Sequence, residues 1–268
     1  MGTLILAVTS LFLYSVGTAL QALHFRGRVQ SNLAITTLIG ILALTSHGLL
    51  ITRTVYHDGG FDLSFFKSSL LISWLIVFLL LGLNLRKPVQ GLFLGVYPLA
   101  ALTVIVALIT HTPSRLVSEQ SYGVLSHIAL SVTAYSLFTL AAIQAILLYF
   151  QNRQLKHNYN SLLVRNLPPL QTMESLLFEM VWAGVVLLVL AIVTGALFIE
   201  DLFAQHLAHK TVFSLLSLLV FVALLIGRYT QGWRGMTASR WTLAGCFLLM
   251  LAFYGSKFVL ELVFHRGG

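Results

Sequence analysis

The feature that most constrains this chain is a succession of eight long apolar segments separated by short polar connections. A helix needs roughly 20 apolar residues to cross the hydrocarbon core of a bilayer, and each segment has about that length. Backbone groups within the bilayer must form hydrogen bonds inside their own segment, which predicts helices throughout. With bounds good to about three residues, the spans are Leu4–Leu23, Leu33–Val55, Ser68–Leu85, Gly91–Thr110, Tyr122–Phe150, Leu176–Ile199, Lys210–Gly227 and Trp241–Phe264.

The composition agrees with this placement. The 268 residues are 58% hydrophobic and only 9% charged, whereas a soluble domain carries about 25% charged residues. We therefore predict an all-α polytopic membrane protein with its eight helices in one bundle, residues 1–268 forming a single transmembrane domain. The longest polar connection, Gln151 to Ser175, contains Pro168 and Pro169 and is predicted to be a loop with a short interfacial helix.

The basic residues predict the orientation in the membrane. Of the 16 Lys and Arg, one set of connections holds ten and the other side receives six, several at helix ends. The richer set consists of Arg26, Arg28, Arg86, Lys87, Arg153, Lys156, Arg165, Arg228, Arg234 and Arg240. The positive-inside rule makes these connections cytoplasmic, so both termini are expected to face outward. The net charge of +8 then reflects topology and anionic headgroups, and we expect no nucleic-acid partner.

The cysteine content limits the possible chemistry of the chain. Cys246 is the only cysteine and falls within the eighth span, so the chain has neither a thiol pair nor a C-x-x-C-H site for covalent haem. Without such a site, the protein is not expected to be a c-type cytochrome itself.

The first segment has no basic n-region and no small-residue cleavage site, so we expect it to be a retained span.

Histidines supply the candidate ligands. His47 lies about two turns inside the outer end of the second span, His127 about one turn inside that of the fifth, and His265 marks the outer end of the eighth. Three imidazoles at similar depth suit axial ligation of haem iron. The alternative is that each imidazole forms a hydrogen bond with a neighbouring helix, and these residues alone leave both open.

Four other histidines give weaker indications of a binding site. His24 and His157 fall in connections predicted to be cytoplasmic, where we expect a solvated surface role. His206 and His209 have i, i+3 spacing before the seventh span and could share one helical face. A metal site there needs a third ligand, such as Glu200 or Asp201, so we expect an interfacial role.

Several short motifs, in order along the chain, resemble one known family. Leu125–Tyr135, which contains His127, is similar to the external-histidine helix of the cytochrome c assembly proteins, the CcsA, CcmC, CcmF and HemX group. The other matching stretches are Gly59–Ser64, Ser73-Trp74, Val193–Phe198, Gly232–Gly235 and Phe253–Gly255. Together they cover nearly the whole chain. Within that group the chain most resembles the YpjD-type inner membrane proteins, which are shorter members, and this implies a multi-pass protein of a bacterial inner membrane.

The resemblance implies haem handling. In the haem-delivering members, two external histidines flank a tryptophan-rich loop and hold haem iron; by position these are His127 and His265 here, and His47 falls where some members carry an intramembrane histidine. The chain departs from the family pattern between Phe198 and Lys210, where it has no tryptophan.

Two functions follow as expectations. The first is a haem-binding or haem-handling protein in c-type cytochrome biogenesis or haem homeostasis. It would hold haem rather than catalyse bond formation, with Lys210, Lys257 or Arg266 pairing with propionates, and other assembly proteins of the membrane as partners. The second is a structural or regulatory partner of another membrane protein that has lost haem delivery. A transporter is a weaker alternative, because intramembrane charges are few.

Overall fold

A computed structural model describes residues 2–30, 32–57, 60–62, 64–110, 116–117, 121–157, 166–198 and 208–255. Within these ranges, eight helices are long and apolar enough to cross a membrane, which confirms the predicted class of an all-α, multi-pass membrane protein. If all eight cross, an even number of crossings leaves both ends of the described chain on one side. Which side that is stays a prediction from the basic residues.

The helices separate into two compact units, which we describe one at a time. Unit 1 comprises residues 1–119 and 160–167, and unit 2 comprises 120–159 and 168–268. The prediction of one transmembrane domain stays a prediction, because this division describes each unit alone.

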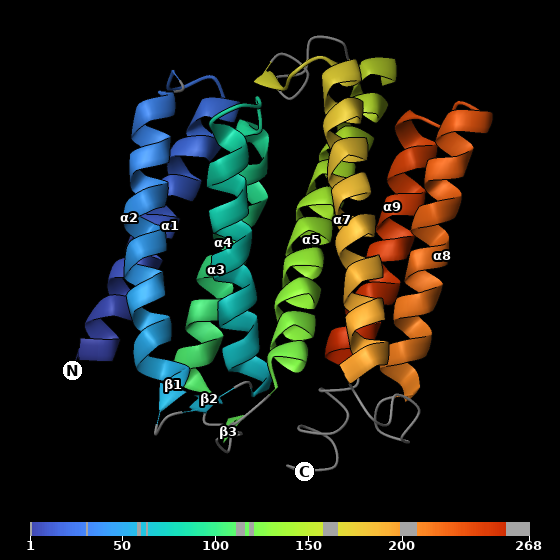
Figure 1. The fold of residues 1–268 in the computed structure, drawn as a ribbon. Coiled ribbons are helices and arrows are strands. Elements are labelled where there is room, and N and C mark those ends of the chain that lie inside the picture. Colours follow the sequence, from blue (N-terminus) through green and yellow to red (C-terminus); the bar gives the residue numbers. More distant parts are fainter. Residues whose placement is uncertain are drawn as a thin grey trace. The chain divides into compact units, whose positions relative to one another are not determined.

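Among the described residues, unit 1 contains four long helices and a small antiparallel sheet with strand order β1-β2-β3 (Figure 1). The elements are α1 (Gly2–Phe25), α2 (Leu33–Thr54), β1 (Tyr56–His57), β2 (Gly60–Asp62), α3 (Phe65–Asn84), α4 (Gln90–Ile109) and β3 (Leu116–Val117). The sheet aligns Tyr56 with Phe61, and Phe61 with Val117.

Small residues allow the helices of unit 1 to approach one another closely. Tyr97 of α4 packs against Gly17 of α1 and Gly40 of α2. A Cβ atom at Gly17 would lie 2.6 Å from the Tyr97 ring, and one at Gly40 would lie 2.5 Å from its hydroxyl. Close packing at glycines is how membrane helices gain contact when lipid offers no hydrophobic driving force between them.

Unit 2 contains the other four long helices (Figure 1). They are α5 (Tyr122–His157), α7 (Leu170–Phe198), α8 (Ala208–Thr230) and α9 (Gly235–Met250), which continues into a π-helical turn, η1 (Leu251–Gly255). Helix α5 packs along α7 and α9, and α8 packs along α9. Phe138 of α5 stacks on Phe221 of α8, with ring centroids 4.0 Å apart.

The connection predicted over Gln151–Ser175 is wrong at both ends. Helix α5 continues to His157 and α7 already begins at Leu170. Backbone carbonyls of the predicted connection accept hydrogen bonds from α5: the Gln144 amide donates to the Met173 carbonyl (3.0 Å), and the amide of Gln151, in the added turns of α5, donates to the Pro168 carbonyl (2.8 Å). Hydropathy locates the part of a helix that lies in hydrocarbon, whereas these helices extend beyond it.

The last span also begins earlier than predicted, at Gly235 rather than Trp241. The backbone of Gly235 has a φ of 55°, and its N–H donates to the buried Glu174 carboxylate of α7 (2.6 Å). Glycine tolerates this left-handed conformation, so Gly235 can begin α9 directly after the turn. The predicted end of this span, together with His265, lies outside the described residues.

Candidate functional site

His127 lies five residues after the start of α5, at the depth predicted from the sequence. Its Nδ1 is 2.6 Å from the backbone carbonyl oxygen of Ala191 in α7. Because a carbonyl can only accept, Nδ1 carries a hydrogen, and in the neutral imidazole Nε2 then carries the lone pair. The Ser131 hydroxyl, one turn along α5, lies 3.5 Å from Nε2, at the limit of a hydrogen bond.

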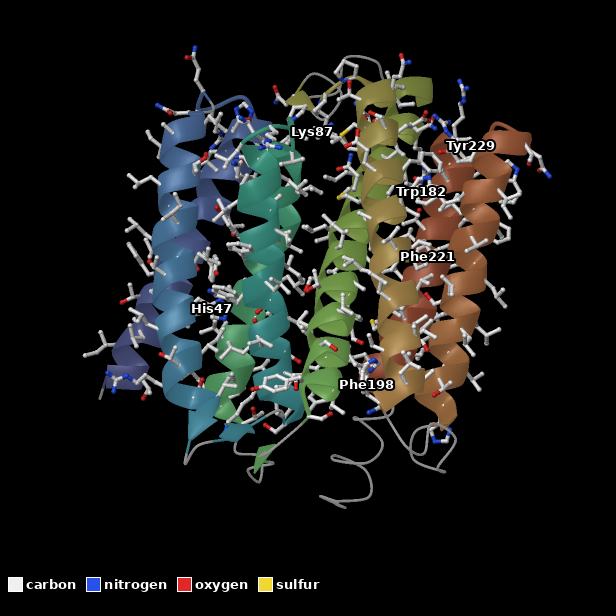
Figure 2. The ribbon with its side chains drawn as sticks, viewed as in Figure 1. His47, Lys87, Trp182, Phe198, Phe221 and Tyr229 are labelled. Carbon is white, nitrogen blue, oxygen red and sulfur yellow. The ribbon has the colours of Figure 1, made fainter. Side chains whose placement is uncertain are left out.

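Gly195 of α7 makes room for this imidazole. A Cβ atom at position 195 would lie 2.9 Å from both Cε1 and Nδ1 of His127. Nearby, the Phe198 ring of α7 packs against Gly123 of α5, and Figure 2 shows Phe198 at this end of the helix pair. Two stretches that resemble the family, Leu125–Tyr135 and Val193–Phe198, therefore meet around His127.

The donor set at His127 fits a metal ligand. Metal-binding histidines commonly donate their second ring N–H to a carbonyl, which orients the ring and makes the coordinating nitrogen more basic. His127 is partly exposed and has this arrangement. Within the described ranges, no group of three or more His, Cys, Asp or Glu side chains is placed to hold an ion.

His47 occupies a different environment, inside unit 1. Its side chain is 0% exposed, and Nδ1 lies 3.0 Å from the hydroxyl of Tyr14 in α1, with the rings edge to face. The backbone of Leu70 approaches the imidazole, but no partner reaches Nε2 with the geometry of a hydrogen bond. Figure 2 labels His47 within the helices of this unit.

Two pairs of hydroxyl groups also join the helices of unit 1. The hydroxyls of Ser10 and Ser46 are 2.7 Å apart and join α1 to α2. A second hydroxyl pair, Ser73 and Thr103, joins α3 to α4 at 2.7 Å. His47 itself is fully buried, and among the described residues its Nε2 has no hydrogen-bond partner. This environment supports a hydrogen-bonding role more directly than contact with a porphyrin.

The other predicted positions are only partly described. His265, Lys257, Arg266 and His206 lie outside the described residues, and so does the stretch 199–207 that lacks tryptophan. His209 is exposed at the start of α8, next to the partly buried Lys210. His24 is at the surface, where it bonds the Val29 carbonyl (3.2 Å).

Two features of these sites escaped the sequence analysis. The partner of His127 is a main-chain carbonyl, which leaves no signature in side-chain identity. Glu174 was assigned to a loop, whereas it is 5% exposed in α7 and accepts the Gly235 N–H. The sequence did contain an indication of this role, because Glu174 is a carboxylate at the edge of a long apolar segment. An ionisable residue in such a position is costly to bury and usually has a specific partner.

Comparison with known proteins now identifies the family. The model of the family described as "Cytochrome C assembly protein" matches residues 35–264. The chain is 31% identical to inner membrane protein YpjD of Escherichia coli K12, over 97% of this chain and 99% of the relative. It is 25% identical to protein HemX of Brevibacillus brevis, over 92% and 93% of the two chains. No solved structure matches.

This chain therefore belongs to the cytochrome c assembly protein family. The predicted resemblance to that family, including its YpjD and HemX members, is confirmed. The protein is a multi-pass protein of the inner membrane, and its family membership supports a role in the biogenesis of c-type cytochromes.

Proposed function

We propose that this protein binds and holds haem at the outer side of the membrane for c-type cytochrome biogenesis or haem homeostasis. Haem is its cargo, His127 is one axial ligand through Nε2, and His265 is the other. His47 is a further candidate, secondary because it is fully buried. Lys210, Lys257 and Arg266 are the cations proposed to pair with the propionates.

The observation that carries this proposal is the hydrogen bond between His127 Nδ1 and the Ala191 carbonyl. With Nδ1 donating to this carbonyl, the lone pair of Nε2 in the neutral ring is free of that bond, and the imidazole is partly exposed. Among the described residues, the partner of Nε2 is the Ser131 hydroxyl at 3.5 Å, the limit of a hydrogen bond. Coordination of iron would supply the partner.

A second candidate is a structural or regulatory partner of another membrane protein. The sequence between Phe198 and Lys210 favours it, because this stretch lacks the tryptophans that pack against haem in haem-delivering members. In that case His127 acts as a helix-joining residue, and the exposed side of its ring contacts lipid or a protein.

Absorption spectroscopy separates the two candidates. The protein is purified in mild detergent from membranes supplied with haem, and its haem content is determined independently as the pyridine haemochrome. We expect a Soret band with bis-imidazole character and a stoichiometry that falls in His127→Ala. Wild-type protein without a Soret band would reject the haem proposal and favour the partner protein.

A further inference from the structure

We propose that the ends of α7 and α8 in unit 2 form a binding site for the headgroup of an anionic phospholipid, centred on the guanidinium of Arg228. This proposal does not depend on haem. It rests on a preorganised arginine, an adjacent pair of hydrogen-bonded aromatic residues, and apolar stripes that lead away from the arginine along both helices.

Arg228 is held in place by groups that do not neutralise its charge. Its Cζ lies 4.6 Å above the ring of Phe178 in α7, and Nη1 donates to the backbone carbonyl of Trp233 (3.4 Å). Neither of these two groups carries a negative charge. A guanidinium has five N–H donors in a planar fork, so most remain available for the oxygens of a phosphate.

The turn after α8 fixes the position of this arginine. The Trp233 indole packs on Gly227, where any Cβ atom would collide with the ring. The Gly227 carbonyl accepts the N–H groups of both Gln231 (3.0 Å) and Trp233 (3.1 Å). Gly232, with a φ of 66°, allows the reversal. The carbonyl that orients Arg228 is therefore itself held by the folded turn.

Two exposed aromatic side chains stand beside the arginine. Trp182 follows Phe178 by one turn of α7, Tyr229 follows Arg228 in α8, and the indole N–H donates to the Tyr229 hydroxyl (3.2 Å). Trp182 is 46% exposed and Tyr229 is 72% exposed. Figure 2 shows them near the same end of the α7–α8 pair. Tryptophan and tyrosine at the level of the headgroups are typical of the membrane–water boundary.

Apolar side chains continue from this pair toward the centre of the membrane. On α7, Val186 and Leu190 follow Trp182 at intervals of four residues, and both are exposed. On α8, Ile226 and Leu219 precede Tyr229 in the sequence, and both are exposed. The site therefore offers a cation and polar aromatic groups at one end and a hydrocarbon surface below them, which are the two parts of a phospholipid.

The charge selects an anionic lipid over a zwitterionic one. Exposed Arg234 and Arg240 add positive charge at the same end, which belongs to the connections predicted to be cytoplasmic. The Glu174 carboxylate of α7 accepts the Gly235 N–H. Basic pockets between membrane helices on this side commonly bind anionic headgroups.

Quenching of tryptophan fluorescence by brominated lipids tests the proposal. Full-length protein is reconstituted in phosphatidylcholine vesicles containing increasing amounts of brominated phosphatidylglycerol, and in a matched series with brominated phosphatidylcholine. The difference between wild type and Trp182→Phe isolates the quenching of Trp182. We expect phosphatidylglycerol to bind about five-fold more strongly than phosphatidylcholine at this position.

Variants distinguish a site from a general attraction to positive charge. Arg228→Gln should abolish the preference, whereas Arg240→Gln, with the same change in charge at an exposed position, should retain it. Arg228→Lys keeps the charge and provides a second test if the glutamine variant does not fold; it should retain only part of the preference.

Equal quenching by the two lipids in wild type, or equal losses in Arg228→Gln and Arg240→Gln, would overturn the proposal. Displacement of the brominated lipid by inorganic phosphate would also overturn it, by indicating a site for the free anion.

Discussion

Gly195 of α7 lies against the imidazole of His127 in α5, so closely that a methyl group there would be 2.9 Å from two atoms of the ring. The glycine and the histidine are 68 positions apart in the sequence, yet each belongs to a stretch that resembles the cytochrome c assembly family. Their contact explains why a small residue is needed at this position, and it makes the orientation of His127 accessible to mutation.

The first prediction concerns this contact. Gly195→Ala should displace the His127 ring and lower haem occupancy, although alanine is favoured over glycine within a helix by about 1 kcal/mol. Gly82→Ala is the matched control, because nothing lies within 4 Å of a Cβ atom at that helical position. The haem-to-protein ratio of the two variants is the measurement. Full haem occupancy in Gly195→Ala would contradict the view that His127 must keep its present orientation.

The second prediction concerns the buried pair in unit 1. Tyr14→Phe removes only the hydroxyl and leaves Nδ1 of the fully buried His47 without its partner. We expect a loss of about 1–3 kcal/mol in the free energy of unfolding, measured by denaturation in detergent, with haem binding through His127 unchanged. Thr9→Val is the control, since that hydroxyl is exposed and bonds only its own helix. Equal stability of the two variants would show that the pair does not stabilise the unit.

His47→Ala provides the third prediction. If His47 mainly joins α1 to α2, its replacement should destabilise unit 1 while reducing haem occupancy less than His127→Ala does. Haem content normalised to folded protein separates the two effects. A selective loss of haem with unchanged stability would instead make His47 a principal ligand.

The fourth prediction concerns the segment before α8. His209 is exposed, and the sequence offers no tryptophan between Phe198 and Lys210, so the double change of His206 and His209 to alanine should leave haem binding nearly intact. Titration of the purified double variant with haem, next to wild type, measures this. Loss of haem binding in the double variant would show that this segment is part of the haem site.

The fifth prediction concerns topology. The basic residues of three connections, including Arg26, Arg153 and Arg228, predict that these connections are cytoplasmic and that the C-terminus faces outward. A reporter that is active only in the cytoplasm should therefore be silent when fused after Gly268. A fusion after Arg153 should be active. Strong activity at Gly268 would refute the predicted orientation.

The number and order of the spans could be predicted because hydropathy is a local property of the sequence. The depths of His47 and His127 followed from the same pattern. Helix ends were less predictable. Gln151 was assigned to a loop by its polarity, yet it lies in α5, where its amide bonds the Pro168 carbonyl. Such pairing depends on the packing of helices, which a local measure of polarity does not contain.

The environment of each histidine could not be predicted from the sequence for a similar reason. Tyr14 and His47 are 33 residues apart, and many polar residues could have partnered that imidazole equally well. His127 bonds a main-chain carbonyl, which any residue at position 191 would have supplied. The residue types suggested a possible ligand, whereas its hydrogen-bond partner, tautomer and exposure depend on the packing of α5 against α7.

The haem content of wild type compared with His127→Ala tests the central proposal most directly. Both proteins are purified from haem-replete membranes and their Soret absorbance is normalised to protein. We predict a clear Soret band in wild type, a reduced one in His127→Ala, and partial recovery when free imidazole occupies the vacated axial position. A wild type without bound haem, or a His127→Ala variant with an unchanged spectrum and stoichiometry, would contradict haem ligation by His127.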